Sequence, residues 1–411
     1  MRKRMFRLIA IVICLVLLGQ YIAPLEVFAQ NRNEMPVPVA EMVETDGTIS
    51  EYGLIDDGYE PARSSANSFS LYSTTESALP ENYTSPYVTA VKDQNPYGTC
   101  WTFATAAISE ASVMKENISA SPDYSEFFTG YTVYHRNGVT DPLRNTLGDY
   151  MDTPGASQGY WYGKGGNLWY SSLGMLGWQG SATEQRYPYA NVLGSIPKEE
   201  FYQADAHLQE VETYHPEDLS AMKRAIMKYG AISASYYHAN EYSGYNPNLY
   251  YPYAVTSNHA VTLVGWDDSY SQDHFTSYDV KPENPGAWLM KNSWGDWAGN
   301  DGYFWISYED KTLCDVYAFR METADNYQHN FHLDGGYSGH FLKLEDGWNY
   351  VANVYTNELD TPQSVEAVGI YLKAIEATCE VQVYLNPEAG KPMSGTPLLS
   401  KPVTEYFQYE G

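Results

Sequence analysis

The sequence predicts an α+β fold over residues 80–323 and a partial antiparallel β-sandwich over 324–411. Three observations lead to this prediction. An Ala-rich segment after Cys100 has the composition of a helix, while residues 258–268, 288–295 and 302–306 are apolar or aromatic runs typical of strands. From 327 onward apolar and polar residues alternate between turn signals, which indicates a separate domain built from strands.

The helix predicted after Cys100 follows a loop that contains Pro96 and Gly98. Such loops end where a helix begins, so we expect Cys100 in its first turn. The partial positive charge of a helix N-terminus favours a thiolate there, and the amide of Gln94 can donate to a carbonyl that the sulfur attacks. Considered alone, Cys100 fits a buried structural thiol equally well. Its partners downstream decide between the two interpretations.

Two residues further along the chain have the chemistry that a nucleophilic cysteine needs. His259 stands at the start of one predicted strand and Asn292 at the end of another. An imidazole can take the thiol proton, and a third polar group can fix the orientation of the ring. The spacing therefore predicts a site in which Cys100, His259 and Asn292 share one cleft.

Four short motifs together resemble the papain family of cysteine proteases. They are Q-x-x-x-G-x-C-W from Gln94, N-H-A-V-x-x-V-G-W from Asn258, K-N-S-W-G from Lys291 and G-Y-F-W-I from Gly302. Their order is that of the family, and the match covers roughly residues 80–322. The resemblance implies a two-lobed protease with a helical lobe and a β-barrel-like lobe. It also implies a papain-like cysteine endopeptidase that cuts proteins through a thiolate and an acyl-enzyme intermediate.

The same resemblance implies a role for five residues. Cys100 would be the nucleophile, His259 its general base and later general acid, and Asn292 the group that orients the imidazole. The Gln94 amide and the backbone N–H of Cys100 would form the oxyanion hole. Trp294 would cover the hydrogen bond between the imidazole and the carboxamide and keep water away from it.

The Gly-rich segment 163–166 is the expected substrate-binding loop. Glycine lets another backbone approach closely, and the resemblance implies that Gly165 and Gly166 pair with the substrate main chain. An ordinary loop is the alternative. Trp169 and the segment Tyr187-Pro188-Tyr189 stand where the family has them, which favours the substrate-binding interpretation.

The spacing of the three catalytic residues predicts insertions. His259 follows Cys100 by 159 residues and Asn292 follows it by 192, whereas roughly 130–150 is typical of the family. Turn residues place one insertion between Met114 and Trp161, and a second occupies residues 269–286.

The N-terminal part of the chain predicts export and later activation. Residues 1–29 combine four basic residues, an apolar run and a small residue at Ala29, as in a signal peptide. Residues 30–79 are acidic and rich in Pro and Ser, which indicates either a disordered linker or the pro-segment of a zymogen. The order of elements favours the pro-segment. A secreted bacterial protein, at the cell surface or wall or released from it, is therefore expected.

Charge and cysteine content exclude several other classes. The chain carries a net charge of −27, so binding to nucleic acid or anionic lipid is not expected, and no stable membrane anchor remains after signal cleavage. Only Cys100, Cys314 and Cys379 remain in the exported chain, which argues against a disulfide scaffold. The resemblance places a family disulfide at Tyr97 and Gly163, where both cysteines are missing. No motif has zinc-ligand spacing, so neither metal nor cofactor is expected.

The alternating segments 351–355, 368–372 and 381–385 predict strands of the last domain. This domain resembles the lectin-like β domain that follows the protease in some clostridial-type surface proteases. We expect it to contact a cell-surface glycan or a surface protein, while the protease acts on protein or peptide substrates. It is shorter than such a domain, which indicates either a truncated chain or strands supplied from elsewhere. Two other functions stay open: a catalytically idle surface binding or adhesion protein, and a hydrolase of cell-wall peptides.

Overall fold

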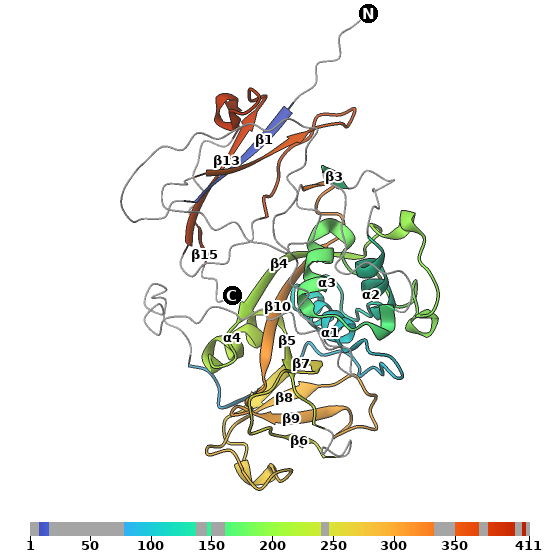
Figure 1. Ribbon diagram of the computed structural model, residues 1–411, viewed down its shortest axis with the longest axis vertical. Coiled ribbons are helices and arrows are strands. Elements are labelled where there is room, and N and C mark those ends of the chain that lie inside the picture. Colours follow the sequence, from blue (N-terminus) through green and yellow to red (C-terminus); the bar gives the residue numbers. More distant parts are fainter. Residues whose placement is uncertain are drawn as a thin grey trace, which may run out of the picture.

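The structure is a computed structural model that describes residues 8–15, 78–136, 146–148, 161–239, 246–332, 350–369, 377–398 and 405–407. The expected insertion turns at 137–138, 141–142 and 153–155, and residues 30–77 of the expected pro-segment, lie outside these ranges. Figure 1 shows helices α1, α2 and α3 on one side of a long sheet and a separate sheet at the far end of the molecule. The mixed α+β architecture predicted from the sequence is confirmed.

The regular elements follow the chain in this order. The α-helices are α1 (Cys100–Lys115), α2 (Glu126–His135), α3 (Leu168–Gly174) and α4 (Leu219–Tyr229). The strands are β1 (Leu8–Leu15), β2 (Asn82–Thr84), β3 (Thr146–Gly148), β4 (Ala206–Tyr214), β5 (Ile232–Tyr236), β6 (Asn248–Leu249), β7 (His259–Asp267), β8 (Ala287–Lys291), β9 (Tyr303–Ser307), β10 (Cys314–Thr323), β11 (Asn330–His332), β12 (Tyr350–Thr356), β13 (Ala377–Leu385), β14 (Thr396–Pro397) and β15 (Glu405–Phe407). Single-turn helices include η4 (Tyr189–Asn191) and η6 (Gln272–His274).

Helix α1 is the element on which both lobes pack. It begins at Cys100, as predicted, and lies against α2 and α3 on one side and β7 and β10 on the other. Thirteen of its sixteen residues are buried, including Ser109, Glu110 and Ser112. A helix enclosed on nearly every side needs apolar or internally bonded residues all around rather than one apolar stripe. The buried Ser109, Glu110 and Ser112 therefore contribute to packing and hydrogen bonding inside the protein.

The long sheet brings the ends of two strands together. Its order is β4-β10-β5-β7-β8-β9-β6, with β2 added beside β7. Antiparallel pairing sets Thr262 of β7 opposite Lys291 of β8. In this register the start of β7, at His259, lies beside the end of β8, where Asn292 follows. The strands predicted around both residues are confirmed.

Each lobe has its own hydrophobic core. Trp101, Phe128 and Trp161 belong to the core of the helical lobe. Trp266 and Trp288 belong to the core of the sheet lobe, against which α4 also packs. Asp218 caps α4 by accepting a hydrogen bond from Ala221 N–H.

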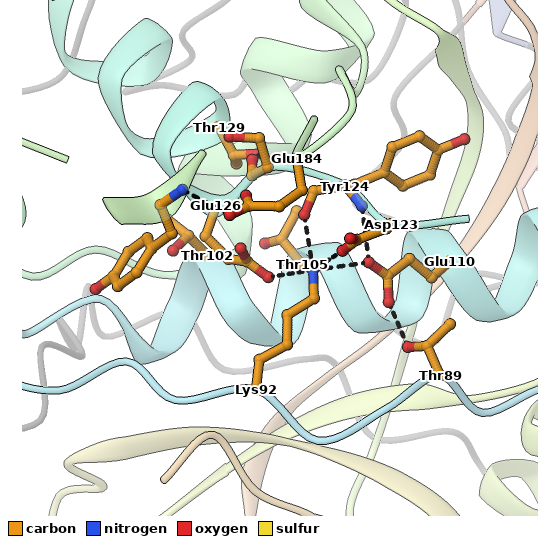
Figure 2. Close-up of polar contacts among 12 residues, drawn as sticks. Thr89, Lys92, Thr102, Thr105, Glu110, Asp123, Tyr124, Glu126, Thr129 and Glu184 are labelled. Carbon is orange, nitrogen blue, oxygen red and sulfur yellow. Dashed lines mark hydrogen bonds and ion pairs between the residues drawn. The ribbon is translucent and has the colours of Figure 1, made fainter. Parts of the chain in front are cut away.

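A buried cluster of charges lies where the two lobes meet (Figure 2). Lys92 Nζ lies 3.1 Å from Glu110 of α1, 2.8 Å from Asp123 and 2.9 Å from Glu126 of α2, and it also donates to the carbonyl of Tyr124. Burial lowers the pKa of Lys92, but the carboxylates of Glu126 and Glu110 together raise it by more, so that the ammonium stays charged. The cluster is thus a partly buried cation surrounded by acceptors, of which Glu110 and Glu126 are buried.

The same cluster reaches the sheet lobe through one hydroxyl. Lys291 Nζ, at the end of β8, donates to Thr89 Oγ1 at 3.0 Å, and Thr89 in turn donates to Glu110. Lys291 and Lys92 therefore bind opposite ends of the Glu110 carboxylate, one of them through a threonine. Because Lys291 precedes Asn292, this connection ties α1 to the end of β8.

The C-terminal region forms one antiparallel sheet in the part of the chain that the structure describes. Its order is β12-β1-β13-β14, with β15 also paired to β13. The predicted strands at 351–355 and 381–385 are confirmed as β12 and β13. Of the third predicted strand, Val368 and Gly369 lie in no strand, and residues 370–372 are outside the described ranges.

Strand β1 comes from the segment predicted to be the apolar core of the signal peptide. It lies between β12 and β13, with Ile11 opposite Asn353 on one side and Val383 on the other. A run rich in β-branched residues has high strand propensity, which suits this position between two strands. No helix in the described ranges has the length and apolarity to cross a membrane.

Substitution of Lys92 by Met should destabilise the protein by about 3–5 kcal/mol at pH 7, because it leaves carboxylates buried without their cation. Burial raises the pKa of Glu126 from 4.5 to about 7, so folding favours its protonated form. The loss should therefore shrink as the pH falls from 7 to 5. Urea unfolding at both pH values measures it.

The control for this experiment is Lys228→Met. Lys228 also donates to a glutamate, Glu212, at 2.8 Å, but its side chain is 55% exposed. An exposed pair is worth about 0–1 kcal/mol. Equal losses from the two substitutions would contradict the importance of the buried cluster.

Candidate active site

The Cys100 side chain lies at the junction of the two lobes. The backbone N–H of Ala260 in β7 donates to Cys100 Sγ at 3.5 Å, across a sequence separation of 160 residues. Ala260 follows His259, so the first turn of α1 and the first residues of β7 lie in contact. Both Cys100 and His259 are fully buried.

His259 and Asn292 are joined by a hydrogen bond of 2.7 Å from imidazole Nε2 to the Asn292 side-chain oxygen. The same oxygen accepts from the backbone N–H of Ser293 at 2.8 Å, which fixes the orientation of the carboxamide. Since the oxygen can only accept, Nε2 carries the proton. The basic nitrogen of the neutral ring is therefore Nδ1.

The Trp294 indole covers the imidazole. The two rings stack with centroids 4.7 Å apart and an angle of 23° between their planes. Trp294 is itself buried, so the ring keeps water from the face of His259 that it covers. A shielded hydrogen bond between His259 and Asn292 is stronger than one in contact with water.

Burial dominates the electrostatics of the pair. It raises the pKa of the Cys100 thiol to about 12, although the backbone N–H groups of Ala260, Trp101 and Cys100 lower it. Burial also lowers the pKa of His259 to about 4, against the opposing effect of the Asn292 hydrogen bond. The helix N-terminus that was expected to favour the thiolate is thus outweighed by desolvation. Neither group ionises alone, and charges form when the proton passes from one to the other.

Gln94 is held by both lobes. Its side-chain oxygen accepts from the Ser293 hydroxyl at 2.8 Å, and its Nε2 donates to the carbonyl of Tyr97 at 2.9 Å. Its backbone N–H donates to the carbonyl of Ser293 at 2.8 Å. These contacts identify Nε2 as the end of the Gln94 amide that carries the two N–H groups.

The two glycines of the expected substrate-binding loop are buried. Gly165 has a φ of +73°, which favours glycine, and its carbonyl accepts from the Tyr134 hydroxyl. A Cβ on Gly166 would come within 2.3 Å of the Trp101 ring. In this structure Gly166 is therefore required by packing against the residue after Cys100, and pairing with substrate stays a prediction.

A ring contact lies where the resemblance placed a family disulfide. Tyr97, before the nucleophile, packs edge-on against Tyr162, which precedes Gly163, with ring centroids 4.9 Å apart. The contact joins the loop before α1 to the Gly-rich loop without a covalent bond.

Two residues near the pair were missed from sequence. Ser293 orients Gln94, and the His238 ring contacts the Trp294 ring edge-on, with centroids 4.6 Å apart. A lone histidine after a strand and a serine inside a motif carry no distinguishing pattern. Only the fold brings them to the site.

No group of three or more His, Cys, Asp or Glu side chains suited to a metal occurs within the described ranges. The Cys314 sulfur lies away from the site, 3.2 Å from the Ser257 hydroxyl. The side chains gathered at the site are a thiol, an imidazole and two carboxamides. Together with a two-lobed α+β fold, this set defines a papain-like cysteine protease.

Comparison with known proteins gives the same class. The profile of the "Papain family cysteine protease" matches residues 157–323, and that of the "Lectin like domain" matches residues 327–411. The chain thus carries a papain-family cysteine protease domain followed by a lectin-like domain. The first match includes His259 and Asn292 but not Cys100 or Gln94.

Among curated relatives, mouse cathepsin K is 25% identical over 270 residues, which are 62% of this chain and 68% of that protein. Mouse cathepsin J is 27% identical over 56% of this chain and 60% of its own length. The region of similarity thus spans about two thirds of these relatives.

Two solved structures are similar to part of this chain. The protease and lectin-like domains of Cwp84, a surface layer associated protein of Clostridium difficile, are 28% identical, with a TM-score of 0.48 over 61% of this chain and 53% of that one. Bromelain from Ananas comosus is 22% identical, with a TM-score of 0.43 over 59% of this chain and all of its own.

Substitution of His259 by Gln should slow alkylation of Cys100 by iodoacetamide at pH 7 by about 1000-fold or more, because the thiolate is the reactive form. With the base removed, the raised pKa of about 12 governs the thiol. The rate should then rise about tenfold per pH unit from 7 to 10, while the wild-type rate levels off. Mass spectrometry of the Cys100 peptide measures both profiles.

His274→Gln is the matched control, since this histidine is exposed in η6 and should leave the profile unchanged. A His259→Gln protein that is alkylated at the wild-type rate would contradict the coupling of the two groups.

Proposed function

We propose that this protein is a secreted cysteine endopeptidase that hydrolyses peptide bonds in proteins through Cys100, His259 and Asn292. One observation carries the proposal: Cys100, at the start of a helix, accepts a hydrogen bond from the residue that follows the carboxamide-bound His259, 160 residues further along the chain. An idle binding protein would not need the imidazole, carboxamide and indole in this arrangement.

In the first half of the reaction, Cys100 transfers its proton to Nδ1 of His259 while the sulfur attacks the carbonyl carbon of the substrate. The carbonyl π bond breaks and its electron pair moves to oxygen. That oxyanion would accept hydrogen bonds from Gln94 Nε2 and the backbone N–H of Cys100. The imidazolium then protonates the leaving amine, the C–N bond breaks, and a thioester remains on Cys100.

In the second half, water attacks the thioester carbonyl. Nδ1 of His259 takes a proton from the water, and the second oxyanion uses the same two donors. Collapse of this intermediate breaks the C–S bond, and the proton returns to sulfur. Asn292 and Trp294 act throughout by holding the ring, since the Nε2–H bond leaves Nδ1 directed to its reaction partners.

The proposed organisation of the chain is a signal peptide at 1–29, a pro-segment at 30–79, the protease at 80–323 and the lectin-like domain at 324–411. The zymogen part of this proposal is supported by the order of the elements, with an acidic segment rich in Pro and Ser before the protease. The lectin-like match supports a role for the last domain in contact with a cell-surface glycan or protein.

Cys100→Ala should abolish hydrolysis of a protein substrate such as casein, and Gln94→Ala should lower kcat by about 100- to 1000-fold, because one oxyanion donor is lost. Cys314→Ser and Gln203→Ala, which change the same residue types outside the site, should each retain activity within about twofold. Casein hydrolysis by the Cys100→Ala protein at the wild-type rate would rule out the mechanism.

Removal of residues 1–79 should increase the rate at which an epoxide inhibitor labels Cys100 by about tenfold or more, because a pro-segment over the cleft would keep the inhibitor from the thiol. Limited proteolysis followed by mass spectrometry measures labelling before and after cleavage. Equal rates would show that the pro-segment does not keep the inhibitor from the thiol.

A further inference from the structure

We propose that Tyr189 is a positioning residue for the oxyanion hole: its hydroxyl holds both ends of the loop that carries the two donors. The inference rests on the proposed function and extends it to a residue of the helical lobe outside the Cys100–His259–Asn292 set. Tyr189 lies in η4, 89 residues after Cys100 in the sequence.

The Tyr189 hydroxyl makes two hydrogen bonds to the loop. It donates to the Gln94 carbonyl at 2.9 Å and lies 2.6 Å from the Thr99 hydroxyl oxygen. A phenol has one proton. Because the Gln94 carbonyl can only accept, that proton is used there, and Thr99 must be the donor in the second bond. One hydroxyl therefore bridges the first and last residues of the loop 94–99.

Hydrogen bonds within the loop connect the residues held by Tyr189 to the Gln94 side chain. Tyr97 N–H donates to the Gln94 carbonyl at 3.0 Å, and Thr99 N–H donates to the Tyr97 carbonyl at 3.0 Å. The Tyr97 carbonyl also accepts from Gln94 Nε2 at 2.9 Å. The position of the amide that would bind the oxyanion thus depends on a turn whose two ends are fixed by Tyr189.

The second donor depends on the same bond. Thr99 is the N-cap of α1, and a threonine there usually accepts a hydrogen bond from an N–H of the first turn. Here its hydroxyl donates to Tyr189 and caps no N–H of the helix. Because Thr99 immediately precedes Cys100, this bond holds the residue next to the second donor, the backbone N–H of Cys100.

Tyr189 is itself rigidly placed. Its ring packs edge-on against Phe103 of α1, with centroids 4.9 Å apart, and its backbone N–H donates to Glu184 at 2.7 Å. Pro188 precedes it and fixes the backbone there. Burial raises the pKa of its hydroxyl, so the phenol keeps its proton and remains a donor.

The test compares two reactions of Cys100, measured on chain that has been activated by removal of the pro-segment. Peptide hydrolysis forms an oxyanion, whereas alkylation by iodoacetamide displaces iodide from a saturated carbon and forms none. Tyr189→Phe should lower kcat for hydrolysis by about tenfold, which is less than the loss of a direct donor, and change KM and the alkylation rate by no more than about twofold.

Tyr187→Phe is the matched control. Tyr187 lies in the same segment and its buried hydroxyl donates to Glu200, away from the loop. The Tyr187→Phe variant should lose about as much thermal stability as Tyr189→Phe and keep kcat within about twofold of the wild-type value. Thr99→Val removes the other partner of the bridge and should reproduce the Tyr189→Phe pattern. The double variant should cost little more than either single one, since both remove the same bridge.

Three outcomes would overturn the inference: unchanged kcat in Tyr189→Phe, an equal loss of hydrolysis and alkylation, or an equal loss in Tyr187→Phe. The second would show general damage to the site. If the wild-type protein is alkylated at Cys100 but hydrolyses no peptide, or if Cys100→Ala stays active, the proposed function itself fails, and the inference fails with it.

Discussion

The contact between the first turn of α1 and the first residues of β7 is the interaction on which the rest of the site depends. Neither lobe holds all the groups of the proposed catalytic set, because the thiol comes from the helix and the imidazole from the sheet. The lobes must therefore be fixed relative to one another. Backbone hydrogen bonds from Gln94 N–H to the Ser293 carbonyl and from Gly295 N–H to the Lys92 carbonyl do this at the edge of the site.

Behind those backbone bonds, the buried charges take the place of an apolar interface. Lys92 and Lys291 share Glu110 from opposite sides, one directly and one through Thr89. Buried ion pairs add little to stability compared with apolar packing, but they demand a specific geometry. A mismatch between the lobes would leave a charge unpaired in a low-dielectric interior. The cluster can therefore define the relative position of α1 and β8 more precisely than an apolar contact would.

The sequence predicted the parts of this structure that depend on local pattern. The first residue of α1, the strands that start at His259 and end before Asn292, and strands β12 and β13 each follow from apolar runs bounded by turn residues. What it could not predict arises from contacts between distant segments. Desolvation of Cys100 needs both lobes, and the bridge from Tyr189 reaches back 90 residues to Thr99 and 95 residues to Gln94. The place of residues 8–15 within a sheet was missed because their composition fits an export leader equally well.

The packing of Tyr97 on Tyr162 has a chemical consequence for the working conditions of the enzyme. A nucleophilic sulfur functions only while it is kept from oxidation, so thiol hydrolases work best in the presence of reductant. A crosslink made of sulfur would be exposed to that same reductant. Reductant does not affect the contact between two phenol rings. The loop that would carry the proposed oxyanion donors therefore stays attached under conditions that would reduce a disulfide.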